Sequence, residues 1–271
     1  MRAETLEQGV AHSGEGFIDD DHSGDADPKS VLARAVLILD AFEVDTPALS
    51  FSDFCRHTGL PRSTVHRMLD QLVSTGILER VGDRYQLGTR IFELGTFVRR
   101  YTRLREIALP FMYDLHEATH ETVHLGVLSG HDVLYLEKIT GHGTNAVPSD
   151  IGGRRPAHCT GLGKVLLAYA GDDVIEEVLA NGLTAMTPST IVDPNVFRDE
   201  MRTIRQLGVA FDREEVVPGL KCAAVPLRGS GRAIAALSIT GPASRIKVDR
   251  LGPALKTAAN GIWRVMFPHR E

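Results

Sequence analysis

The chain has 271 residues, of which 43% are hydrophobic and 24% are charged, and its formal net charge is −5. This length suits two domains with hydrophobic cores of their own, and the composition is that of a soluble globular protein, which excludes fibrous and wholly disordered classes. No segment approaches the roughly 20 consecutive apolar residues that span a bilayer, and the first residues lack the apolar core of a secretory signal. We therefore expect no membrane partner. The isolated cysteines Cys55, Cys159 and Cys222 lack the spacing of a disulfide framework or a zinc site, so we expect a cytoplasmic protein.

Residues 1–28 carry eight acidic residues against Arg2 alone, so more than the whole net charge of the chain comes from this segment. The segment also has few large apolar residues, which predicts a disordered acidic tail. The rest of the chain is slightly basic, and the net charge neither excludes nor supports binding to nucleic acid.

Three predicted helices follow, over residues 30–43, 50–59 and 61–75. The second opens with Ser50 as a helix-capping residue and Asp53 three positions on, and it closes at Gly59, which suits a sharp turn between helices. Pro61 stands in the first turn of the third helix, and Gly76 ends that helix. This order of elements predicts a helix-turn-helix unit within a domain of residues 29–88.

The third helix has its apolar residues at i, i+3, i+4, i+7 and i+8, which buries one face and leaves donors on the other. Short hydroxyls and forked cations near the start of such a helix are suited to phosphates and base edges in a major groove. Residues 77–80 and 84–87 then predict a hairpin, or wing, whose arginines would touch the DNA backbone. An ordinary surface helix with a solvated polar face is the alternative. The candidate DNA-binding residues are Arg62, Ser63, Thr64, His66, Arg67, Arg80 and Arg84.

Residues 89–105 predict one linker helix whose apolar stripe favours a dimer seam, although packing on its own domain would give the same stripe. A helix over 110–119 and alternating strands over 121–128 and 133–140 come next, joined by a turn. Helices over 162–169, 173–180, 196–207 and 248–267 and strands over 209–212, 222–228 and 233–240 complete the pattern. Hairpin-joined strands flanked by helices predict an α+β domain with an antiparallel sheet over residues 106–271.

Three blocks resemble the IclR family of transcriptional regulators: GLPRSTVHR at 59–67, RRPAHCTGLGKVLLA at 154–168, and GVAFDREE at 208–215 with its continuation to residue 242. The resemblance covers about residues 29–267. It implies a winged helix-turn-helix, a linker helix and an effector-binding domain similar to the GAF fold, in a dimer or tetramer that responds to a small organic molecule. Cys55 departs from the pattern of the family, and we expect it to be a buried packing residue.

The helix that follows Thr160 would leave the N–H groups of Gly161 and Leu162 free, and a helix N-terminus of this kind suits a carboxylate. The resemblance adds Asp212, Cys222 and Ser238, which match positions that line the effector pocket of the family. Leu125 and Leu220 would supply apolar contacts. For Cys222 and Ser238 the alternative is strand packing, and for Asp212 it is a salt bridge or a turn cap at the sheet edge.

Two other motifs have to be weighed. Residues 116–120 match the pattern HExxH, with His116 and His120 as zinc ligands and Glu137 as the third candidate, which would make the chain a zinc-dependent hydrolase. That pattern needs a helix that continues, whereas a strand follows here. Residues 160–164 faintly resemble a phosphate-binding loop but lack its upstream glycine and the hydroxyl residue after Lys164.

The sequence therefore predicts a DNA-binding regulator, which we expect to be a repressor, with a near-palindromic double-stranded operator and a small carboxylic acid as partners. No cofactor, metal or catalysis is expected. A small-molecule sensor that acts through protein partners is a further alternative.

Overall fold

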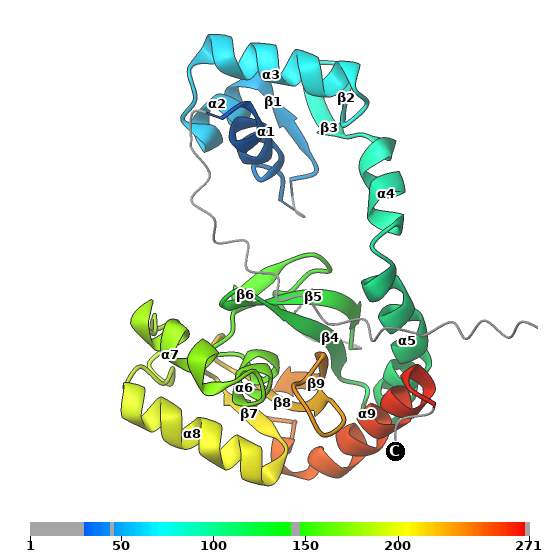
Figure 1. Ribbon diagram of the computed structural model, residues 1–271, viewed down its shortest axis with the longest axis vertical. Helices are drawn as coiled ribbons and strands as arrows, with labels where there is room; N and C mark the ends of the chain where they lie inside the picture. Colours follow the sequence, from blue (N-terminus) through cyan, green and yellow to red (C-terminus); the bar gives the residue numbers. More distant parts are fainter. Residues whose placement is uncertain (1–29, 44–45, 142–146, 269–271) are drawn as a thin grey trace, which may run out of the picture.

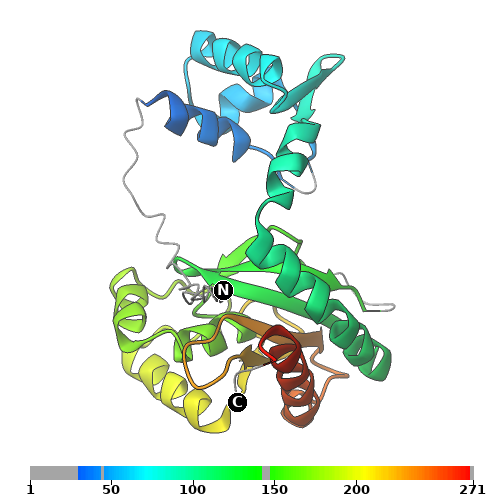
Figure 2. The same cartoon turned by 45° about the vertical axis from the view of Figure 1, so that its right-hand side comes forward.

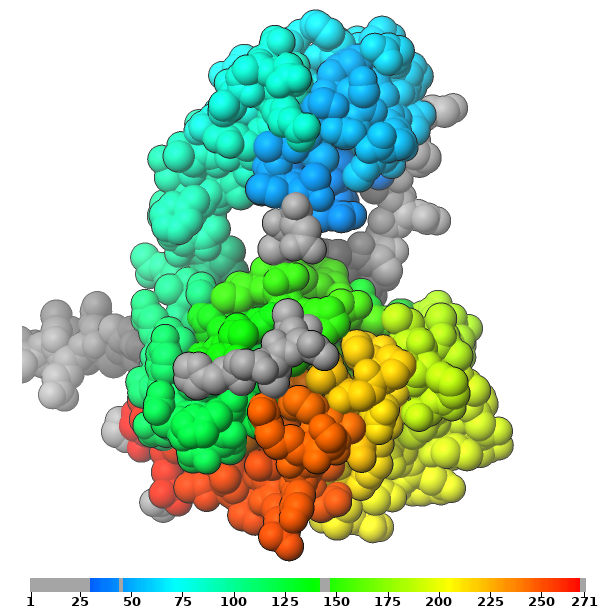
Figure 3. All heavy atoms as spheres, turned by 180° about the vertical axis from the view of Figure 1, so that it is seen from behind, coloured from blue at the N-terminus to red at the C-terminus, as the bar shows by residue number. Residues whose placement is uncertain are grey.

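The computed structural model describes residues 30–43, 46–141 and 147–268, and the expected acidic tail over 1–28 lies outside these ranges. Figure 1 shows an N-terminal domain and a larger C-terminal domain joined by the helices α4 and α5. Seen from behind as spheres, the two domains are connected along one side of the molecule (Figure 3).

The N-terminal domain packs three helices against a small antiparallel sheet of strand order β1-β3-β2. Ile38, Phe54 and Leu69 form its centre and are fully buried. β1 is a strand that the sequence pattern did not predict. The elements are α1 (Val31–Leu39), β1 (Ala48–Ser50), α2 (Phe51–Thr58), α3 (Arg62–Ser74), β2 (Leu78–Val81) and β3 (Arg84–Leu87).

The predicted boundaries of the helix-turn-helix are confirmed by their local chemistry. Asp53 N–H donates to Ser50 Oγ over 3.3 Å, and Ser50 N–H donates back to Asp53 Oδ2 over 2.9 Å, so both groups at the start of α2 are satisfied. Hydrogen bonds from Ser50 lower the pKa of Asp53 to about 2. Gly59 ends α2 with φ = 64°, a backbone conformation that glycine adopts without strain.

The linker region differs from its prediction as a single helix over residues 89–105. Two helices are present, α4 (Thr89–Thr96) and α5 (Arg99–Thr119), and they are separated at Phe97 and Val98. α5 also runs through Pro110, where the sequence predicted a separate helix to start. Figure 2 shows α4 and α5 as two successive segments between the domains.

The C-terminal domain is built on one six-stranded antiparallel sheet of order β6-β5-β4-β9-β8-β7. Helices α5 and α9 cover one face of the sheet, and α6 to α8 cover the other (Figure 1). The predicted α+β class and antiparallel sheet are confirmed. The elements are β4 (Thr122–Ser129), β5 (Asp132–Ile139), β6 (Arg154–Pro156), α6 (Gly161–Ala168), α7 (Asp172–Ala180), α8 (Pro194–Leu207), β7 (Ala210–Arg213), β8 (Leu220–Leu227), β9 (Ala235–Pro242), the 3₁₀ turn η1 (Val248–Arg250) and α9 (Gly252–Met266).

The two faces of this sheet differ because neighbouring strand residues point in opposite directions. On β9, Leu237 and Ile239 pack in the core under α5 and α9, whereas Ser238 and Thr240 face the other side. A strand shift of one residue would exchange these two sets, so the pairing fixes which polar side chains face away from the core.

In the described part of the chain, no helix is both long and apolar enough to cross a membrane.

Candidate functional site

The exposed face of α3 carries the residues predicted to read DNA. Val65, Met68, Leu69 and Leu72 are buried on its inner face, as their spacing predicted. Thr64 is half-buried at the boundary between the two faces. The exposed members of the set on α3 are Arg62, Ser63, His66 and Arg67.

Phe51 at the start of α2 supports two of these side chains. The guanidinium of Arg62 lies 4.8 Å from the centroid of the Phe51 ring, and the His66 ring meets the same ring edge-to-face at 6.0 Å. His66 Nδ1 is also 2.9 Å from Asp70 Oδ2, one turn further along the helix. Arg67 makes no hydrogen bond or ion pair with any described residue, so its guanidinium is available to a partner.

The wing arginines are exposed but are bonded to backbone oxygens. Arg80 Nε donates to the carbonyl of Gly82 over 3.2 Å within the hairpin. Arg84 Nη1 donates to the carbonyl of Ala48 over 3.0 Å, which holds it against β1. Each guanidinium keeps further donors for another acceptor, because arginine has five N–H groups.

All six residues predicted for the effector site line one pocket in the C-terminal domain. Its empty space is about 460 Å³, which includes the mouth open to solvent. The predicted members are Thr160, Gly161, Leu162, Asp212, Cys222 and Ser238, together with Leu220 as an expected apolar contact, and the lining residues not predicted are His124, Tyr135, Val147, Pro148, Ser149, Arg155, Val216, Val217 and Thr240.

The floor of this pocket is a polar stripe that takes one residue or more from every strand of the sheet. In a flat sheet the two edge strands would be roughly 24 Å apart, because strands are about 4.8 Å from their neighbours. Residues of both edge strands nevertheless line the same pocket, so the sheet curls around it. In sheet order, we call Arg155, Tyr135, His124, Ser238, Cys222 and Asp212 the polar stripe.

The start of α6 lies over Cys222 on β8, toward the Asp212 end of the stripe. Gly163 N–H donates to Thr160 Oγ1 over 2.9 Å, whereas the N–H groups of Gly161 and Leu162 have no partner among the described residues. A Cβ atom on Gly161 would stand only 2.9 Å from Cys222 Sγ, so glycine is needed for this close approach. The expected helix N-terminus is thus open to an acceptor beside the floor of the pocket.

Burial decides the ionisation of the stripe. It lowers the pKa of His124 to about 3, so the ring is neutral, and its Nε2 is 2.8 Å from Ser149 Oγ. Burial raises the pKa of Cys222 to about 12, which keeps it a thiol. Burial also raises the pKa of Asp212 to about 7, although Asp212 Oδ1 accepts a hydrogen bond of 2.7 Å from Glu215 N–H.

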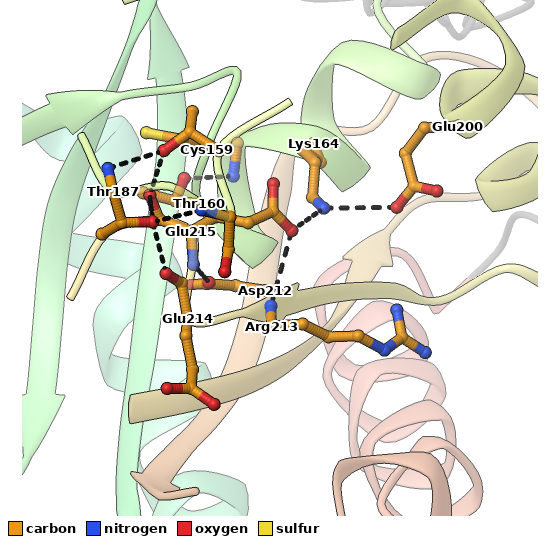
Figure 4. Close-up of polar contacts among 12 residues, drawn as sticks. Cys159, Thr160, Lys164, Thr187, Glu200, Asp212, Arg213, Glu214 and Glu215 are labelled. Atoms are coloured by element: carbon orange, nitrogen blue, oxygen red, sulfur yellow. Dashed lines mark hydrogen bonds and ion pairs between the residues drawn. The ribbon is translucent and has the colours of Figure 1, made fainter. Parts of the chain in front are cut away.

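A buried ion cluster holds the loop that follows Asp212 (Figure 4). Lys164 Nζ on α6 lies 2.5 Å from Glu215 Oε1 and 3.2 Å from Glu200 Oε1 on α8. Thr187 Oγ1 donates to the carbonyl of Glu214 over 2.7 Å from the other side. Glu214 has φ = 69°, an unusual value for a residue with a side chain, and these contacts hold it there.

Among the described residues, one hydroxyl of the stripe has no oxygen or nitrogen hydrogen-bond partner. The side chain of Ser238 is 1% exposed, and among the described residues its Oγ and Glu215 Oε2 are the two buried side-chain oxygens without one. The thiol of Cys222, a weak donor, is its polar neighbour. Buried polar atoms are usually paired, so an unpaired one that lines a pocket points to a bound group.

Sequence reasoning missed the residues that close the mouth of the pocket. Lys138 Nζ donates to the carbonyl of Val147 over 3.0 Å and to that of Ser149, and Arg155 Nη2 donates to the carbonyl of Pro148. These three consecutive residues are thereby tied across the pocket. No local sequence signal marks residues 147–149 as part of the pocket, because the cations that bind them, Lys138 and Arg155, lie on the strands β5 and β6.

One expectation, for Leu125, was wrong, and the zinc alternative lacks geometric support. Leu125 does not line the pocket, because it faces the core under α5 and α9 and is fully buried there. The zinc interpretation needs two histidines on one helix face, but α5 ends at Thr119 and His120 has φ = 59°. His116 Nδ1 lies 2.9 Å from the carbonyl of Glu121, and Glu137 accepts hydrogen bonds from Arg105. Within the described ranges, no three His, Cys, Asp or Glu residues gather as a metal site would require.

A winged helix-turn-helix joined by helices to a domain with a polar, partly enclosed pocket defines a DNA-binding transcription factor with a small-molecule domain. Comparison with known proteins gives the family. Residues 31–82 match the IclR helix-turn-helix domain, and residues 97–264 match the bacterial transcriptional regulator IclR C-terminal domain. The chain belongs to the IclR family of transcriptional regulators.

Curated relatives agree along most of the chain. The HTH-type transcriptional regulator XynR of Escherichia coli is 35% identical over 219 residues, which cover 79% of this chain and 87% of XynR. The transcriptional repressor IclR of the same organism is 30% identical and covers 81% of this chain and 82% of its own length.

Solved structures share the fold. An IclR homologue of Microbacterium hydrocarbonoxydans, crystallised with 4-hydroxybenzoate, has a TM-score of 0.81 and 36% identity, over 87% of this chain and 100% of that chain. The IclR of Thermotoga maritima has a TM-score of 0.70 and 30% identity, over 87% and 98% of the two chains.

Proposed function

We propose that this regulator is a cytoplasmic repressor without enzymatic activity, whose binding to a near-palindromic operator is controlled by a small carboxylic acid. Residues 29–88 form its DNA-binding domain, residues 89–105 the connection and residues 106–271 the effector-binding domain. The proposal rests on one observation, that all six residues predicted to bind an effector line the same pocket. The same chain also presents exposed hydrogen-bond donors on α3.

In the DNA-binding domain, α3 enters the major groove. Arg62, Ser63, Thr64, His66 and Arg67 face the bases and the adjacent phosphates, and Arg80 and Arg84 of the wing contact the flanking backbone. The contacts of Arg62 and His66 with Phe51 fix their starting positions, whereas Arg67 is unengaged and free to reach DNA.

The regulator acts as a dimer, or as a pair of dimers. Large apolar side chains of α1 and of the connection are exposed to solvent: Leu32 is 78% exposed, Phe92 77% and Phe97 73%. Exposed apolar groups clustered on helices outside the core are typical of an interface. The dimer seam expected from the linker stripe would therefore include Phe92 and Phe97 as well as Ile91, Leu94 and Val98, whereas Tyr101 packs against the core of its own domain.

The effector is an organic or aromatic acid that lies between the start of α6 and the polar stripe. The open N–H groups of Gly161 and Leu162 suit a carboxylate, and Ser238 Oγ offers an unused hydrogen bond. The 4-hydroxybenzoate in the Microbacterium homologue supports an aromatic acid as one candidate. Because binding free energies are linked, effector and operator must change each other's affinity by the same factor.

A gel-shift titration tests the proposal. The full chain is incubated with its own upstream intergenic DNA across a salt series, and the titration is repeated with candidate carboxylic acids. A specific shift that weakens with salt and is altered by an acid is expected. Absence of a shift on every promoter fragment would overturn the repressor and favour a sensor that acts through protein partners.

A further inference from the structure

Arg155 is the cation on the polar stripe, and it occupies the edge strand β6 at the mouth of the pocket. It is half-buried, and its Nη2 donates to the carbonyl of Pro148. It forms no ion pair with any residue of the described ranges. A guanidinium carries five donors, so four N–H groups remain beyond the Pro148 contact.

The neighbouring Arg154 shows that this placement is particular to one position. Arg154 points to the opposite side of the strand, is exposed, and donates to Ser129 O over 3.1 Å and to Ser129 Oγ over 3.0 Å. It does not line the pocket. Two adjacent arginines of identical chemistry therefore differ in whether a pocket ligand can reach them.

The pocket thus has two separate places that favour an anion. The first is the start of α6, which lies beside Cys222 on β8, and the second is Arg155, on the opposite edge strand from Asp212. A ligand at the first place is indicated independently by the buried, unpartnered Ser238 Oγ on the pocket floor. In sheet order Tyr135, His124 and Ser238 lie between them, so the two places are separate positions along the stripe.

We propose that the effector is a dicarboxylic acid, with one carboxylate at the start of α6 and the second paired with Arg155. Asp212 faces the α6 end of the stripe, so the end at Arg155 is the one free of a competing acid. Arginine binds a carboxylate through two parallel N–H···O bonds, which supplies both charge and geometry for the second group. The inference rests on the proposed effector site and names its ligand class.

The test compares acids that differ only in the second carboxyl group. Calorimetric titration of the full chain at pH 7.5 uses benzoate against benzene-1,4-dicarboxylate, and hexanoate against hexanedioate. We expect at least one diacid to bind roughly tenfold or more tighter than its monoacid, as a charge-assisted hydrogen-bonded pair allows.

Arg155→Gln should bring the ratio of diacid to monoacid affinity close to one, since the second carboxylate loses its charged partner, whereas loss of the Pro148 contact acts on both kinds of acid alike. Arg154→Gln is the matched control and should keep the preference in full. Equal affinity of the unaltered chain for the monoacid and the diacid would overturn the dicarboxylate inference, and so would an undiminished preference in Arg155→Gln. In either case, binding of the monoacid would still support the pocket as the effector site. If neither kind of acid binds, the effector site itself is overturned, and the dicarboxylate inference with it.

Discussion

The five candidate DNA-reading residues of α3 come from six consecutive positions, 62–67, whereas the polar stripe of the pocket draws its members from six strands spread over residues 124–238. The first set is exposed to water apart from Thr64, which is half-buried. The second is largely buried and includes an unpaired hydroxyl and a carboxyl whose pKa is raised to about 7.

This difference separates two kinds of substitution. A change on the exposed face of α3 removes a contact with a partner and leaves the fold almost untouched. A change around the pocket alters groups that have lost their hydration, so it acts on stability and on ligand binding together. The four predictions below follow from this contrast, from the largest effect to the smallest.

Lys164→Met should have the largest effect, because Glu215 would be left as a buried carboxylate without its cation. We expect a loss of about 3 to 5 kcal/mol in the free energy of unfolding of the C-terminal domain. Trp263, the only tryptophan of the chain, lies on α9, so its fluorescence in urea titrations reports this domain.

Lys247→Met makes the same chemical change on the surface and should alter stability by less than about 0.5 kcal/mol. Adding Glu215→Gln to Lys164→Met should restore part of the loss, since the stranded charge is removed. A double variant as unstable as the sum of the two single variants would show that the Lys164–Glu215 pair is not coupled.

Asp212 makes stability fall as pH rises. The pKa of Asp212 is about 7 in the folded chain, against a reference value of 3.8, so the folded state holds the proton more tightly than the unfolded state does. The contribution of the protonated Asp212 to the free energy of unfolding is therefore lost as pH rises from about 4 to 7. Asp212→Asn should therefore gain roughly 3 kcal/mol relative to the unaltered chain at pH 8 and little at pH 4. Urea titrations across this range measure the difference, and a pH-independent difference would contradict the assignment. Asp199→Asn, at an exposed site, is the control.

Arg67→Ala tests the exposed face. Loss of one phosphate or base contact should weaken operator binding roughly tenfold and reduce the slope of log affinity against log salt by about 1. Gel shifts at several salt concentrations measure both quantities. Arg202→Ala removes the same charge from an exposed position on α8. An equal loss of operator affinity in that variant would show that only the net charge of the chain matters.

Ser238→Ala should have the smallest effect on the fold, because its hydroxyl has only a weak contact with the Cys222 sulfur to lose. We expect stability within about 0.5 kcal/mol of the unaltered chain, together with a roughly fivefold loss of effector affinity. Calorimetry with the tightest acid measures the affinity. Ser230→Ala, in an exposed turn, should change neither quantity, and an unchanged affinity in Ser238→Ala would remove that hydroxyl from the site.

The sequence predicted the helix-turn-helix well because its signals are local. The hydrogen bonds between Ser50 and Asp53, the positive φ of Gly59 and the buried stripe of α3 each depend on residues within two turns of one another. Pro110 shows where local rules fail. A proline within a helix removes one backbone hydrogen bond, but Pro110 and Glu106 are both exposed, so the unbonded carbonyl of Glu106 can be hydrated. Ala108 and Met112 are buried against the sheet, and their packing outweighs the cost of the backbone hydrogen bond that Pro110 removes.

The pocket could be predicted only in part. A helix N-terminus after Thr160 is a local signal, and the resemblance to the family supplied Asp212, Cys222 and Ser238. His124 and Arg155 could not be found in this way, because their position depends on strand order and on the curl of the sheet. No spacing in the chain reveals that two edge strands close around the same space.

The edge strands of the six-stranded sheet also bear on how copies of this chain meet. β6 has three residues, including Pro156, and β7 has four, so each free edge offers only a short row of backbone donors and acceptors. Short edges and proline are features that discourage strand-to-strand addition and, with it, runaway aggregation. The self-association that we propose for this regulator would then rest on its helices, whose contacts can close into a finite assembly of the kind that the proposed near-palindromic operator requires.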